Sequence, residues 1–143
     1  MSKFKLVVTL CLCVFLAPAF AQSLAEKEKY AAEEKELSKA AEYASDQCKT
    51  TIKAKIDWSG FNIKEMASNS ASGYCEEAFS ALRQVCGRSE LAMKSVQGKV
   101  KSVTCKYSSP LTVSLKSGEL IFSFSFKDSN LSEKVQAYLM DSL

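Results

Sequence analysis

The feature that most constrains the fold is the alternating pattern of residues 111–127, which read LTVSLKSGELIFSFSFK. Apolar residues occupy every second position on both sides of a polar Lys-Ser-Gly-Glu centre. Side chains on a strand point alternately to opposite faces, so this pattern predicts two strands that each have one apolar face. Gly118 can adopt the positive φ of a tight turn, which joins the two strands into a β-hairpin.

Phe122, Phe124 and Phe126 give the second strand of this hairpin the largest apolar surface in the chain. We interpret the phenylalanine face as part of the hydrophobic core. The alternative is that the three phenylalanines, together with Trp58, the single tryptophan, form a face that holds an apolar ligand.

Residues 1–21 have the pattern of a secretory signal peptide. Lys3 and Lys5 precede an apolar run over residues 6–16, and Ala19 and Ala21 supply the small-x-small ending. A helix of such a run is roughly 16 Å long, too short for a hydrocarbon core of about 30 Å. We therefore predict cleavage between Ala21 and Gln22, a periplasmic or secreted location, and no stable membrane insertion after cleavage.

The charge balance argues against a nucleic-acid partner. Without Lys3 and Lys5, the 19 basic residues fall to 17, against 16 acidic residues, so the mature chain carries no strong positive field. The charge is unevenly distributed, because residues 22–47 hold four lysines and seven acids. We expect a protein partner or a small apolar ligand and no nucleic acid.

Cys48, Cys75, Cys86 and Cys105 remain after cleavage, and an even number in an exported domain predicts two disulfides. Cys75 and Cys86 are eleven positions apart in one expected helix, about 16 Å along its axis, whereas bonded cysteines need Cα atoms within about 7 Å. That excludes Cys75–Cys86 and with it Cys48–Cys105. We favour Cys48–Cys86 with Cys75–Cys105, and Cys48–Cys75 with Cys86–Cys105 stays open. The cysteine spacing fits no zinc site.

Periodicity predicts an α+β fold with a roughly four-stranded, mostly antiparallel sheet. A central helix anchored by disulfides and a C-terminal helix pack on this sheet, beside a long N-terminal helix. We divide the chain into the leader (1–21), the charged helix (22–47) and a disulfide-stapled domain (48–143). Strands are expected over 50–58, 100–107, 111–116 and 119–127, and helices over 23–47, 73–86, 90–97 and from Leu131 onward. Ser72 is the expected N-cap of the central helix, and the loop 59–72 is the first place to look for a binding loop.

The residue types present exclude several chemistries. The chain has no histidine and no glycine-rich phosphate loop, so we expect no cofactor, no metal site and no enzyme. Asp57, Glu65, Glu76 and Glu77 are candidates for a hydrolase that uses carboxylates alone, but nothing in the sequence places two of them across a cleft. We predict a small exported binding protein, an inhibitor or protective partner of an envelope or extracellular protein. The alternatives are a carrier of an apolar small molecule or lipid and, less favoured, the carboxylate hydrolase.

Overall fold

The computed structural model describes residues 23–143, so the predicted leader and its cleavage site lie outside the described residues. The described chain contains four helices and four strands, with two short 3-10 turns at Trp58–Gly60 and Glu65–Ala67. The elements are α1 (Leu24–Cys48), β1 (Lys53–Asp57), α2 (Ala71–Arg88), α3 (Glu90–Lys99), β2 (Ser102–Tyr107), β3 (Thr112–Lys116), β4 (Glu119–Phe124) and α4 (Leu131–Ser142). These bounds lie close to the expected ones, because the spacing of apolar residues differs between helices and strands and can be read within each segment.

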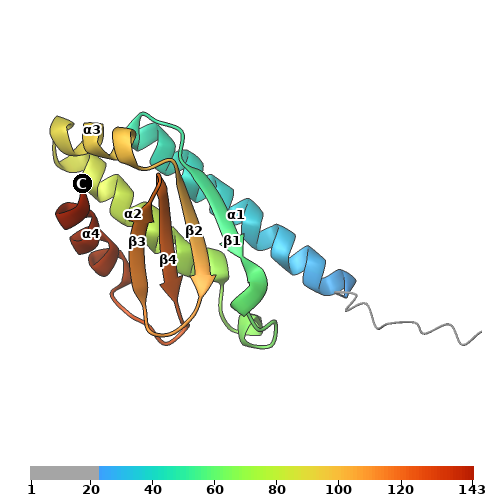
Figure 1. Ribbon diagram of the computed structural model, residues 1–143. Coiled ribbons are helices and arrows are strands. Elements are labelled where there is room, and N and C mark those ends of the chain that lie inside the picture. The colour runs from blue at the N-terminus through green and yellow to red at the C-terminus, as the bar shows by residue number, and fades with distance from the viewer. Residues whose placement is uncertain (1–22) are drawn as a thin grey trace, which may run out of the picture.

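The four strands form one sheet in the order β1-β2-β4-β3 (Figure 1). β1 runs parallel to β2 and β2 parallel to β4, and β3 pairs with β4 in the antiparallel sense. The prediction of a mostly antiparallel sheet was therefore wrong: the sheet is mixed and mostly parallel. Two helices separate β1 from β2 and return the chain to the end of the sheet where β1 began, and β4 then inserts between β2 and β3. The alternation of apolar and polar residues predicts that a segment is a strand, but it does not predict which strand lies next to it in the sheet.

The hairpin prediction is confirmed. β3 and β4 pair in register, with Val113 opposite Phe122 and Leu115 opposite Leu120. The turn between them has positive φ angles at Ser117 (51°) and Gly118 (85°). Two consecutive positive φ angles are the signature of a two-residue turn that matches the twist of the strands.

Helices α1, α2 and α4 cover one face of the sheet, and α2 lies in the middle of this layer (Figure 1). The core lies between the layers, where Phe79, Leu82, Phe122 and Phe124 have no exposed surface. The opposite face of the sheet carries polar side chains such as Lys55, whose neighbours along β1 point inward, as strand geometry requires. Within residues 23–143, no helix is long and apolar enough to span a bilayer.

The end of α1 is fixed covalently to the end of α2. Cys48 and Cys86 form a disulfide with a Cα–Cα distance of 5.3 Å, which confirms the favoured partner of Cys48. Leu37, Ala41 and Ala44 of α1 are buried in the same core, and the small side chains of the two alanines let the two helices approach closely. A loop of this length contributes about 4 kcal/mol in the chain-entropy model.

The start of α2 is held by a buried carboxylate of α1. Glu33 is 4% exposed. One of its oxygens accepts from the backbone N–H (2.8 Å) and hydroxyl (2.6 Å) of Ser72 and from the Ser70 hydroxyl (2.9 Å). The other pairs with Lys29 at 2.8 Å. Burial by itself raises the pKa of Glu33, but the Lys29 ion pair and the serine hydrogen bonds together hold it below the ordinary value of 4.5. The N-cap of α2 is Ser70, two residues earlier than expected, so the prediction of Ser72 as the cap was wrong.

Replacing this carboxylate should destabilise the fold. We expect Glu33→Gln to lower the free energy of unfolding by about 1–3 kcal/mol at pH 7, because a buried amide cannot accept from both serines and pair with Lys29. Since the folded-state pKa is depressed, the wild-type advantage is complete above pH 4.5 and is lost as the pH falls through the lower folded value. Urea unfolding at pH 7 and near pH 3 measures both effects. Glu42→Gln, on the exposed side of α1, is the control, and an equal loss there would contradict this assignment.

Two glycines should respond in opposite directions to alanine. A Cβ on Gly60 would collide with the backbone carbonyl oxygen of Tyr107, on which the loop after β1 rests, so Gly60→Ala should destabilise by about 1–3 kcal/mol. Gly98 lies inside α3 with nothing within 4 Å of the added Cβ, so Gly98→Ala should stabilise by up to about 1 kcal/mol. Thermal unfolding of the two variants beside the wild type measures both effects, and a Gly60→Ala variant as stable as the wild type would disprove the Gly60 contact.

Candidate functional site

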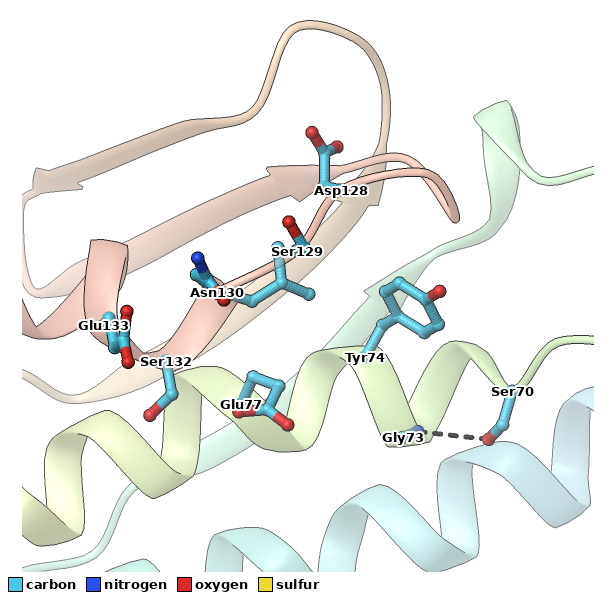
Figure 2. Close-up of a pocket in the computed structure, with 10 residues that line it drawn as sticks. Ser70, Gly73, Tyr74, Glu77, Asp128, Ser129, Asn130, Ser132 and Glu133 are labelled. Carbon is cyan, nitrogen blue, oxygen red and sulfur yellow. Dashed lines mark hydrogen bonds between the residues drawn. The ribbon is translucent and has the colours of Figure 1, made fainter.

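One hollow lies between the start of α2 and the loop that joins β4 to α4. It has a volume of about 470 Å³. Figure 2 shows α2 contributing one wall and residues 128–133 the other. The ten lining residues are Ser70, Gly73, Tyr74, Glu77, Asp128, Ser129, Asn130, Leu131, Ser132 and Glu133.

The topology explains why a pocket forms here. The loop after β1 leads into α2 and the loop after β4 leads into α4, so both helices begin near the carboxyl ends of the parallel strands. In open sheets with parallel strands, ligands bind in the crevice outside these ends. The position of the pocket is therefore one at which folds of this kind hold ligands, although fold-level analogy alone assigns no function.

Tyr74 fixes the pocket wall on the α2 side. Its ring stacks on Phe124 with the ring centroids 5.5 Å apart, and its hydroxyl donates to the carbonyl oxygen of Phe126 at 2.8 Å. The opposite wall begins with a turn in which Asp128 accepts from both the N–H (2.7 Å) and the hydroxyl (2.9 Å) of Ser125. These contacts tie both walls to the end of β4, so the pocket is preformed.

The first turn of α4 offers hydrogen-bond donors to this pocket. Asn130, the N-cap, has a left-handed backbone (φ 55°), and its side chain makes no capping hydrogen bond. The first N–H groups of a helix have no partner within the helix. Among the described residues no side chain caps α4, so its initial N–H groups are available to an acceptor from outside.

The pocket is acidic. Glu77 and Glu133 are exposed and have no ion-pair partner among the described residues, and Asp128 is half-buried. None of the ten lining residues is lysine or arginine. Within residues 23–143, no three acidic or cysteine side chains converge closely enough to hold a metal ion.

The predicted ligand face lies elsewhere. Phe122 and Phe124 are completely buried, and Phe126 is half-buried in an aromatic cluster with Phe61 and Tyr107. Trp58 stacks on Tyr30 with centroids 4.2 Å apart and donates its indole N–H to Glu34 at 2.8 Å. The structure thus places these four residues in or beside the core, and none of them lines the pocket.

The carboxylates singled out in the sequence are dispersed. The Ser59 hydroxyl and N–H donate to Asp57 and lower its pKa. Glu65 accepts from the Tyr107 hydroxyl at 2.6 Å, which raises the pKa of Tyr107. Glu76 is exposed beside Arg83 in another shallow hollow. Glu77 alone among the four lies in the pocket.

The remaining cysteines meet in the core. Cys75 of α2 and Cys105 of β2 are both completely buried and are present as thiols. The bond between them stays a prediction. Burial raises the pKa of the Cys75 thiol well above its ordinary value, and the neighbouring Cys105 thiol raises it further.

Sequence reasoning missed most of the pocket, because its two walls are separated by about fifty positions and no local pattern links them. Residues 128–133 indicated only a turn and a helix start. The nearest signal was the presence of several acidic and hydroxyl residues at two expected helix starts, which is equally typical of helix capping.

Comparison with known proteins adds no relative. No family model matches the chain, and no curated protein or solved structure is significantly similar to it.

Proposed function

We propose that this protein is a small exported, non-catalytic binding protein that holds a basic side chain of a protein partner in the pocket between α2 and the β4–α4 loop. The observation that supports this proposal is the acidic lining: Glu77, Asp128 and Glu133 surround about 470 Å³ without a basic residue among the lining side chains. A positively charged group would relieve the mutual repulsion of these carboxylates.

A peptide fits this site better than a free amine does. The uncapped first turn of α4 lies beside the same carboxylates and calls for a hydrogen-bond acceptor. A lysine or arginine within a polypeptide supplies the cation from its side chain and the acceptor from its backbone carbonyl. Tyr74 adds an aromatic surface for the aliphatic part of such a side chain.

The two alternatives have weaker support. A carrier of apolar molecules needs a hollow lined by the phenylalanine face, yet Phe122 and Phe124 have no exposed surface. A carboxylate hydrolase would have to use the same pocket, with one carboxyl group as acid and a second as base or nucleophile. The binding role requires no such division between Glu77, Asp128 and Glu133, and we favour it for that reason.

The pocket should discriminate by charge. We expect Nα-acetyl-lysine amide, titrated into the ¹⁵N-labelled protein, to shift amide resonances of residues 70–77 and 128–133, and neutral Nα-acetyl-glutamine amide to shift them much less. The double substitution Glu77→Gln/Glu133→Gln should weaken lysine binding about tenfold, because two carboxylates are lost. Added salt should weaken it as well.

The matched control is Glu76→Gln/Asp141→Asn, which removes the same charge from exposed positions of α2 and α4 outside the pocket. It should leave lysine binding within about twofold of the wild type. Equal shifts with the lysine and glutamine probes would refute recognition of a basic group. Shifts confined to other residues would place the binding site elsewhere.

Export is testable separately. Expressed with its own N-terminus in a bacterial host, the chain should appear in the periplasm or medium with Gln22 as its first residue, because Ala19 and Ala21 fit the small positions of a cleavage site. Ala21→Arg should block processing and leave a longer, membrane-associated precursor. N-terminal sequencing of the fractions decides, and a full-length chain in the cytoplasm would contradict the proposed location.

A further inference from the structure

The pair Cys75 and Cys105 has no part in the proposed binding site, and it occupies a position from which it can control that site. Cys75 directly follows Gly73 and Tyr74, which line the pocket, and precedes Glu77 by two positions. Cys105 lies on the inward face of β2, with Ile56 and Phe122 as its partners on the neighbouring strands. A bond between them would join the pocket wall to the second strand of the sheet.

Among the described residues, Cys75 and Cys105 each have only the other as a possible disulfide partner. Cys48 is already bonded to Cys86, so the alternative in which Cys48 pairs with Cys75 is excluded in this structure. The Cys75 and Cys105 side chains are neighbours, and both have no exposed surface. Both residues are present as thiols and belong to the buried core that also contains Ala78, Phe79 and Phe122.

We propose that Cys75 and Cys105 are a redox-convertible pair, present in the folded protein either as adjacent thiols or as a second disulfide that fixes the first turns of α2 to the sheet. The first turns of α2 are held at present by Glu33, Ser70 and Ser72, whereas the far end of the helix is covalently anchored at Cys86. The second bond would anchor α2 near both ends. This inference does not depend on what the pocket binds.

The conversion is ordinary thiol–disulfide exchange. One thiol loses its proton and attacks a sulfur of a small-molecule disulfide such as oxidised glutathione, which forms a mixed disulfide and releases one glutathione. The second cysteine, also deprotonated, then attacks the protein sulfur of the mixed disulfide and releases the second glutathione. Two protein thiols are oxidised and one glutathione disulfide is reduced to two thiols. Because both sulfurs are buried and kept protonated, the exchange requires α2 to open locally from the sheet.

Peptide mapping tests the pair directly. The full chain carrying Cys11→Ser/Cys13→Ser, which removes the two cysteines outside the described residues, is equilibrated in glutathione buffers of graded redox ratio with sub-denaturing urea. The thiols are then trapped with N-ethylmaleimide and the protein is digested with trypsin. Cleavage after lysine and arginine separates all four cysteines, in the peptides 40–49, 65–83, 84–88 and 102–106.

We expect 65–83 joined to 102–106 in oxidising buffer and separate in reducing buffer, with an unchanged circular dichroism spectrum. The link between 40–49 and 84–88 is the internal control. Oxidising buffers that form this control link while 65–83 and 102–106 stay alkylated and separate would overturn the proposal.

Hydrogen exchange tests the consequence for the pocket. In the disulfide form, amides of residues 70–77 should exchange about tenfold more slowly than in the dithiol form, because local opening of α2 is restrained. Residues 90–99 of α3 serve as the segment that should not change. The variant Cys75→Ala/Cys105→Ala should lose the redox dependence. Equal exchange of residues 70–77 in both forms, or a dependence that persists in the variant, would refute the claim that this pair restrains the pocket wall.

Discussion

The structure depends on the burial of α2 between α1, α4 and the sheet. Phe79 and Leu82 of this helix have no exposed surface, and its Ala71, Ala78 and Ala81 are also completely buried. Burial of this kind, at roughly 1.5–3 kcal/mol for each large apolar side chain, outweighs the weak intrinsic stability of a helix that contains two glycines. The Cys48–Cys86 disulfide and the Glu33 network then fix the two ends of α2, one covalently and one through charge and hydrogen bonds.

The same arrangement produces the pocket. Because α2 is held at its start by Glu33, the residues of its first two turns have fixed positions opposite the loop after β4. Tyr74 connects the two walls through Phe126, and Asp128 stabilises the turn that precedes α4. Carboxylates that are favourable near helix N-termini, such as Glu133, therefore gather around one hollow when two helices begin side by side. Charge that favours the start of a helix thereby lines one pocket, and the proposed recognition of a basic side chain rests on this lining.

The sequence predicted some features well and others poorly, for identifiable reasons. The hairpin of β3 and β4 and the course of α2 were predictable, because a period of two and a period between three and four are local signals. Helix rise excluded Cys75–Cys86 but left two pairings open. Cys48–Cys86 was favoured because a helix that follows a strand usually runs back antiparallel to it, which brings Cys86 near Cys48. The strand directions were mispredicted, since β4 lies between β2 and β3 and runs parallel to β2, although it follows β3 in the chain. The N-cap of α2 was misassigned because Ser72 bonds Glu33, a partner 39 positions away.

By itself, the sequence determined which segments are helices and strands, where the hairpin turns, and which cysteines are too far apart along one helix to bond. These features depend on side-chain period, backbone freedom at Gly118 and helix rise, all of which are properties of neighbouring residues. The tertiary structure alone decided that three strands run parallel and that the buried Glu33 accepts hydrogen bonds from the start of α2. It alone also decided that Glu77, Asp128 and Glu133 line the same pocket. Each of these features depends on contacts between segments that are distant in the sequence. The free energy of such contacts comes from burying surface of both segments, so no single segment predicts them.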